Sequence, residues 1–175
     1  CYLLKNRVSL PDKHYNMRYY VIAGEPSGDL HGGKLMQQIA ANDPEAEFRC
    51  TGGDTMAQIA GPGRLKYHYK EMSFFGFVQV ALNLRTIFSQ IDEVKSDIAS
   101  FNPDVVILID YPAFNLRIAK WAKSRGIKVY YYIAPKVWAW KERRVKKLRR
   151  YVDRLYTIFP FETEYFRRHG IEPHF

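Results

Sequence analysis

The most constraining feature of this sequence is an amphipathic helical pattern followed directly by an uninterrupted apolar run. From Leu84 to Phe101, apolar residues recur at steps of three and four, as on one face of a helix packed against a core. Asn102-Pro103 ends the pattern, and the run Val105 to Ile109 (VVILI) follows. A strand that is apolar on both faces is typical of the centre of a parallel sheet covered by helices on both sides.

Strand-like and helix-like segments alternate along the rest of the chain as well. Further strands are predicted over residues 18–23, 47–51, 65–69, 128–133 and 155–159. Further helices are predicted over residues 30–41, 116–123 and 162–168, with a short helix between the Gly52-Gly53-Asp54 turn and the break near Gly61 and a basic helix within residues 136–150. An extended segment is expected to start after Gly170. This alternation predicts the α/β class, as a doubly wound parallel sheet with right-handed crossovers.

Length and composition favour one domain with a substantial core, since the chain has 175 residues and a hydrophobic share of 47%. Met17 is a plausible initiator just before the first strand, so we expect residues 1–16 to lie outside the fold and residues 17–175 to form the domain. No apolar run approaches the ~18 residues of a membrane span. With no signal peptide recognisable and with Cys1 and Cys50 forming no disulfide framework, we predict a cytoplasmic protein with reduced cysteines.

The first candidate site is the stretch VIAGEPSGDLHG, Val21 to Gly32, between a predicted strand and a predicted helix. It lacks the G-x-G-x-x-G fingerprint and the Gly-Lys-Ser/Thr of a P-loop. Ser27 is one place too late for a G-x-S-x-G elbow, which disfavours a serine hydrolase. A loop with free amides before a helix suits hydroxyls and a phosphate, with Asp29 available as the helix N-cap. A plain turn is the alternative.

The second candidate is Asp110, in the stretch LIDYPAFN, at the carboxyl end of the strand expected to be central. Ligands of open α/β sheets bind at those ends, and a partly desolvated carboxylate there suits a general base. Helix capping is the alternative role, although Asn115 is better placed to cap.

The third candidate is the stretch Ile133 to Lys147, which combines aromatic residues with a local excess of positive charge. Eight cations and one acid between Lys136 and Arg150 account for +7 of the net charge of +9. Such a patch attracts phosphates, nucleic acid or an anionic membrane surface. Trp138 and Trp140 precede the cationic helix and suit a sugar ring, an acyl chain, a headgroup or stacking on a nucleic acid. The alternatives are a solvated helix face and ordinary core packing of a tryptophan.

The fourth candidate is the apolar segment Ser73 to Leu84, which suggests an exposed lipophilic patch, with ordinary core as the alternative. No D-x-D, H-E-x-x-H or Cys/His cluster is present, so we expect neither a metal nor a cofactor.

Six blocks, in this order, resemble the N-terminal half of the lipid-A-disaccharide synthase family. They are AGEPSGDLHG (23–32), GGDTM (52–56), FFGFVQV (74–80), IDYPAFN (109–115), APKVWAWKERRV (134–145) and FPFE (159–162). The resemblance runs from about Met17 to the end of the chain. It implies the acceptor-side Rossmann-like domain of a GT-B glycosyltransferase, whose C-terminal UDP-sugar domain is absent from this chain.

The family's reaction joins UDP-2,3-diacylglucosamine to 2,3-diacylglucosamine 1-phosphate, releasing UDP and forming the β-1′,6-linked disaccharide of lipid A. The resemblance implies an inverting hexosyltransferase in which Asp110 takes the proton of the acceptor's 6-hydroxyl. It implies that substrates are bound by the first loop and by residues of two further blocks: Gly24, Glu25, Ser27, Gly28, Asp29, Asn115, Lys136 and Trp138.

Lipid substrates and an anionic bilayer imply peripheral association with the inner membrane. The expected membrane patch is apolar at Phe74, Phe75, Phe77, Val78, Val80, Leu84 and Phe88 and basic at Arg143, Arg144 and Lys147.

The sequence departs from the family pattern at Ala113, where many members have a second acid. That acid is either dispensable or replaced from elsewhere. Because the UDP-binding half is missing, we expect this chain alone not to turn over. The alternative function is a nucleic-acid-binding α/β domain that uses the basic helix within residues 136–150, which explains the charge but gives Asp110 and the first loop no task.

Overall fold

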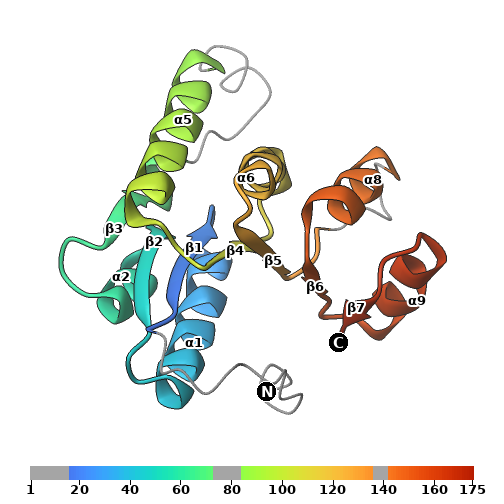
Figure 1. Ribbon diagram of the computed structural model, residues 1–175, viewed down its shortest axis with the longest axis horizontal. Helices are drawn as coiled ribbons and strands as arrows, with labels where there is room; N and C mark the ends of the chain where they lie inside the picture. Colours follow the sequence, from blue (N-terminus) through green and yellow to red (C-terminus); the bar gives the residue numbers. More distant parts are fainter. Residues whose placement is uncertain (1–15, 73–83, 136–141) are drawn as a thin grey trace.

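A seven-stranded, all-parallel sheet forms the centre of the computed structural model, which describes residues 16–72, 84–135 and 142–175 (Figure 1). The strand order is β3-β2-β1-β4-β5-β6-β7. The strands are β1 (Arg18–Ala23), β2 (Glu47–Gly52), β3 (Leu65–His68), β4 (Val105–Ile109), β5 (Lys128–Tyr132), β6 (Arg154–Tyr156) and β7 (Pro173–His174). The predicted doubly wound parallel sheet is confirmed, and β4 is its central strand.

Helices connect the strands and cover both faces of the sheet. They are α1 (Pro26–Asn42), α2 (Asp54–Ala60), α3 (Tyr69–Met72), α5 (Leu84–Phe101), α6 (Pro112–Ser124), α8 (Glu142–Tyr151) and α9 (Pro160–Arg168). In Figure 1, α1 and α2 lie below the sheet, while α5, α6 and α8 lie above it.

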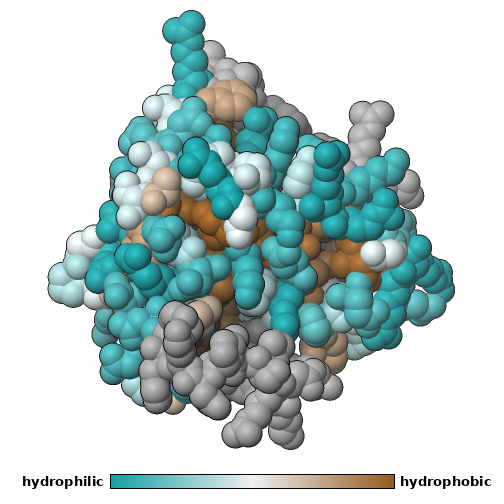
Figure 2. Space-filling model, viewed as in Figure 1, coloured by the Kyte–Doolittle hydropathy of each residue, from teal (hydrophilic) through white to brown (hydrophobic). Residues whose placement is uncertain are grey.

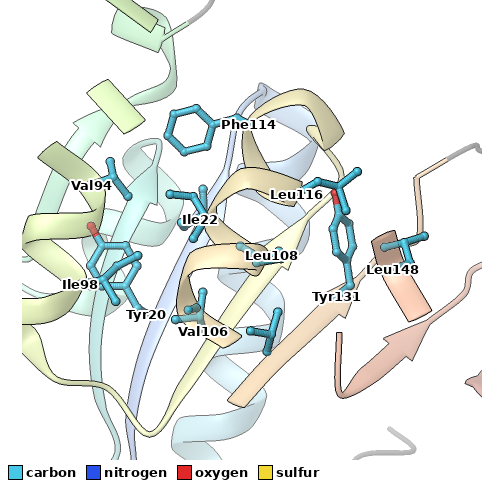
Figure 3. Packing of buried hydrophobic residues seen from close by; sticks show 14 of the residues in the cluster. Tyr20, Ile22, Val94, Ile98, Val106, Leu108, Phe114, Leu116, Tyr131 and Leu148 are labelled. Carbon is cyan, nitrogen blue, oxygen red and sulfur yellow. The ribbon is translucent and has the colours of Figure 1, made fainter. Parts of the chain in front are cut away.

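The core divides into two clusters because side chains alternate between the faces of each strand. Tyr20 and Ile22 of β1 belong to the cluster under α5, α6 and α8 (Figure 3). Val21 and Ala23 belong to the cluster on the other face of the sheet, packed against α1 and α2. All five residues of β4 are buried, as expected for a strand covered on both faces. The predicted face of α5 is buried at Ile91, Val94, Ile98 and Phe101.

An ion pair also anchors α5 to the sheet. Asp97 accepts hydrogen bonds from Arg49 Nη2 at 2.6 Å and from the Tyr20 hydroxyl at 2.7 Å. Both partners come from strands, so the polar contact fixes the position of the helix over β1 and β2.

Three helices begin earlier than the sequence pattern predicts, each with a proline in its first turn. They start at Pro26, Pro112 and Pro160 instead of at residues 30, 116 and 162. Proline is favoured at the first helical position, because its fixed φ suits the helix and the missing N–H would have no partner there. The predicted strand 155–159 is correspondingly short and ends at Tyr156.

Candidate functional site

The predicted site lies where the order of the strands reverses. The chain runs outward from β1 through β2 to β3, then crosses back to place β4 on the other side of β1. Ala23 of β1 and Ile109 of β4 are register partners, so the loops that follow them start side by side. In open α/β sheets, the crevice outside the carboxyl ends at such a switch point is where ligands bind. The structure therefore brings the first two candidate segments together.

The loop after β1 is short and continues directly into α1. Gly24 is buried, and Glu25, in extended conformation, is the N-cap residue of the helix. The Ser27 hydroxyl donates a hydrogen bond to the Glu25 carboxylate, and both side chains are exposed. The first-turn amides of Ser27 and Gly28 have no preceding carbonyl in the helix to bind. This arrangement can offer N–H groups, a hydroxyl and a carboxylate to a sugar or a phosphate.

Asp29 does not have the capping role in α1 that we predicted. It lies inside α1, so it does not cap that helix, and it is only 5% exposed. Its carboxylate accepts hydrogen bonds from the amides of Gly53 at 2.7 Å and of Thr55 and Met56, both at 3.1 Å. Asp29 thus caps α2 from the neighbouring helix, and this burial argues against contact with a substrate.

The two glycines of the loop make close packing possible. A Cβ on Gly24 would lie 2.4 Å from Cγ of Tyr111, and one on Gly28 would lie 3.1 Å from Cβ of Ala23. Gly24 is therefore the point at which the ring of Tyr111 packs against the first loop. The Tyr111 hydroxyl also donates to the carbonyl oxygen of Met72 at 3.2 Å, and its ring stacks on Phe114.

Asp110 lies at the centre of this edge, partly exposed and in an unusual backbone conformation. Asp110 has φ 41° and Tyr111 has φ 44°, and both are left-handed without being glycine. After the adjacent strand β5, Ile133 has φ 65°. Left-handed conformations are disfavoured for residues with side chains, most of all for β-branched ones, and where they occur they concentrate at functional sites.

Asn115 is fully buried and bonded to the main chain. Its Nδ2 donates to the carbonyl oxygens of Asp110 at 2.8 Å and of Ile109 at 3.2 Å. It is not the N-cap of α6, because Tyr111 holds that position. The predicted contact of Asn115 with a substrate does not fit this geometry.

Sequence reasoning missed two tyrosines at this edge, Tyr111 and Tyr131. Tyr131 is fully buried in β5, and its hydroxyl donates to the carbonyl oxygen of Asp110. A signal was available for each: Tyr111 directly follows the candidate acid, and Tyr131 is the middle one of three consecutive tyrosines, which alternation places on the opposite face from its neighbours.

Several predicted residues lie outside the described part of the chain. They are Lys136, Trp138, Phe74, Phe75, Phe77, Val78 and Val80, together with the side chains of Leu84 and Arg143. Of the extension expected over residues 1–16, residues 1–15 also lie outside it. Of the remaining patch residues, Phe88 is 43% exposed and carries the guanidinium of Arg117 at 4.7 Å from its ring centre. Lys147 is exposed on α8, and Arg144 is partly exposed.

A cavity of about 400 Å³ does not coincide with the predicted site. It lies between the end of α2 and the start of β3, lined by Ala57, Gln58, Gly61, Pro62, Gly63 and Leu65. Within residues 16–72, 84–135 and 142–175, no group of three or more His, Cys, Asp or Glu side chains could hold a metal ion. Over the same ranges, every helix is too short or too polar to span a bilayer.

Comparison with known proteins places this chain in a family. The model of the family described as LpxB, lipid-A-disaccharide synthetase, matches residues 19–175. A lipid-A-disaccharide synthase of Geobacter metallireducens is 42% identical over 156 residues, which are 89% of this chain and 40% of the relative. That of Gluconobacter oxydans is 38% identical over 167 residues, 95% of this chain and 39% of the relative. The chain thus spans about 40% of the length of these relatives.

Solved structures agree on the fold. A UDP-GlcNAc 2-epimerase of Methanocaldococcus jannaschii matches 89% of this chain and 44% of its own, with a TM-score of 0.63 at 15% identity. The epimerase of Neisseria meningitidis matches 90% of this chain and 45% of its own, with a TM-score of 0.61 at 10% identity. These matches confirm the Rossmann-like sheet expected for one half of a GT-B protein. None of these comparisons supports the nucleic-acid-binding alternative.

Proposed function

The chain belongs to the lipid-A-disaccharide synthetase family, and on that premise we propose that it is the acceptor-side part of an inverting glycosyltransferase of lipid A synthesis. The substrates would be UDP-2,3-diacylglucosamine and 2,3-diacylglucosamine 1-phosphate. The observation that carries the proposal is Asp110, a partly exposed acidic residue in a left-handed turn at the switch point, directly beside the loop that follows β1.

In the proposed reaction, the carboxylate of Asp110 is the general base. It takes the proton of the acceptor's 6-hydroxyl while that oxygen attacks the anomeric carbon of the donor. The new C–O bond forms as the bond from the anomeric carbon to UDP breaks, so the configuration inverts and UDP leaves with the bonding electron pair. Because the base stands at the centre of the edge, the sugars would lie between the ends of β1 and β4.

The first loop would position the reacting sugars. Glu25 and Ser27 are exposed at the first turn of α1, where the carboxylate can accept hydrogen bonds and the hydroxyl can donate or accept them. A sugar hydroxyl or a phosphate oxygen fits the amides of that turn, because the N-terminal end of a helix favours negative charge. Lys136 and Trp138 follow β5 in sequence, which supports the proposal that they add to the same site.

The nucleotide would be bound mainly by residues outside this chain. The relatives that match are more than twice as long as this chain, since the aligned part of the chain covers 40% of their length. We therefore propose that turnover requires that further part, which would face the edge of the sheet carrying Asp110.

The protein would act at the inner membrane surface as a peripheral protein. Exposed cations on α8 and the exposed ring of Phe88 support this, because basic side chains attract anionic headgroups and an aromatic ring suits the interface. In Figure 2, the surface over α8 and α9, on the right, is mostly hydrophilic.

Substitution of Asp110 by asparagine in the full-length protein tests the proposal. We expect Asp110→Asn to lower kcat by about 10²- to 10⁴-fold, the range typical of a lost general base, with little change in thermal stability. Asp104→Asn is the matched control, because Asp104 directly precedes the first residue of β4, at the other edge of the sheet from Asp110. Its carboxylate accepts a hydrogen bond from the Arg18 amide at 2.8 Å. Near-normal turnover by Asp110→Asn would remove Asp110 as the base.

A further inference from the structure

We propose that Tyr131, together with Asn115, is a positioning residue that holds Asp110 in its left-handed conformation. The inference rests on the proposed role of Asp110 as the base. Neither residue would touch a substrate, and both would act through the main chain of Asp110.

Two side chains from different elements converge on one carbonyl group. The carbonyl oxygen of Asp110 accepts a hydrogen bond from the Tyr131 hydroxyl of β5 and one from Asn115 Nδ2 of α6, at 2.8 Å. Asn115 Nδ2 also donates to the carbonyl oxygen of Ile109 at 3.2 Å. Hydrogen bonds from β5 and from α6 thus hold the main chain at the end of β4.

These bonds matter because of the conformation that they stabilise. With φ values of 41° and 44°, Asp110 and Tyr111 occupy a region that residues with side chains normally avoid. A return of Asp110 to the extended or right-handed region would rotate its carbonyl away from the two donors. The same rotation would move the carboxylate, since both groups are attached to one Cα.

Both donors are buried, so the loss of either hydrogen bond cannot be compensated by solvent. Tyr131 and Asn115 are each 0% exposed, so water cannot replace a hydrogen bond that is lost there. Burial also raises the pKa of Tyr131 well above its ordinary value, which keeps the hydroxyl protonated as a donor. Figure 3 shows the ring rising from β5 with its hydroxyl beside Leu116, near the start of α6.

Phenylalanine at position 131 would remove the hydroxyl and keep the ring in the core. In the full-length protein, we expect Tyr131→Phe to lower kcat by about 10- to 100-fold, as for a slightly misplaced catalytic group, with KM for both sugars within about twofold. Tyr130→Phe is the matched control, because this half-buried neighbour on the same strand packs in the other cluster. It should leave kcat unchanged.

A double-mutant cycle separates positioning from a general structural role. In an Asp110→Glu background the carboxylate is already displaced, so Tyr131→Phe should lower kcat much less than it does beside the native aspartate. An equal loss in both backgrounds would overturn the inference, as would a loss that appears in KM instead of kcat.

Hydrogen exchange gives a readout that does not depend on activity. Tyr131→Phe should speed exchange of the amides of Asp110 and Tyr111, and Tyr130→Phe should not. Unchanged exchange at these amides would also overturn the inference. The Asp110→Asn variant tests a separate claim. If it kept its turnover, the proposed role of Asp110 as the base would fail, whereas the exchange data would still show whether Tyr131 orders the turn.

Discussion

Asp29 illustrates how a single polar side chain can belong to the interior of the fold while it lies in a motif that looks functional. Its neighbours Glu25 and Ser27 are exposed, but its own carboxylate is turned inward to three amides at the start of α2. A helix start that is buried needs such acceptors, because its first amides have no partner within the helix. The motif after β1 therefore combines an outward-facing part with a structural one.

We expect Asp29→Ala to lower the free energy of unfolding by about 2–4 kcal/mol, since it leaves buried amides without acceptors. Asp54→Ala is the matched control, because Asp54 is in the first turn of the same helix but its side chain is 92% exposed. That change should cost less than about 1 kcal/mol. Urea unfolding of the two variants and the native protein measures both. A stable Asp29→Ala protein with a raised KM for its sugars would instead favour substrate binding by Asp29.

Among the elements, α8 has one face buried in the core and an opposite face that is exposed and positively charged. Val145 and Leu148 are buried in the cluster under α5, α6 and α8, whereas Lys146, Lys147, Arg149 and Arg150 are exposed. An exposed row of cations is what an anionic membrane surface would attract, and each cation near such a surface contributes about 1 kcal/mol.

We expect Lys147→Glu to weaken binding to vesicles of phosphatidylcholine and phosphatidylglycerol by about 5- to 30-fold, because one attractive charge becomes repulsive. Lys34→Glu makes the same change of charge at an exposed position on α1, on the other face of the sheet, and should have little effect. Co-sedimentation at low salt measures both variants. Equal losses in the two would show a response to net charge alone, and binding of short RNA in preference to vesicles would favour the alternative function.

At the scale of the whole molecule, the periodic part of the sequence predicts the fold well. The steps of three and four in α5 and the continuous apolar run of β4 each follow from one repeated physical demand, burial of one face or of both. Helix starts at Pro26, Pro112 and Pro160 were harder to predict, because the pattern of apolar residues begins only a turn later.

The candidate site was predictable in its location but not in its internal contacts. Asp110 and the first loop follow neighbouring parallel strands, so their proximity could be derived from strand order. The inward turn of Asp29 and the convergence of Asn115 and Tyr131 on one carbonyl depend on tertiary packing between elements far apart in sequence. No local pattern encodes such contacts.

Burial of Cys50 in the core should make the stability of the fold decrease at alkaline pH. Burial, and secondarily the nearby Asp29 carboxylate, raises the pKa of the Cys50 thiol to about 12, against about 8.5 in an unfolded chain. The folded protein therefore keeps this thiol protonated over a range in which the unfolded chain ionises. The stabilisation is complete below about pH 8.5 and is lost as pH rises toward 12. Between pH 7.5 and 10.5, urea unfolding under reducing conditions should show native stability falling by about 2–3 kcal/mol more than that of Cys50→Ala. Buried tyrosines such as Tyr20, whose pKa burial also raises, contribute equally in both proteins, so parallel pH dependences would contradict the role given to Cys50.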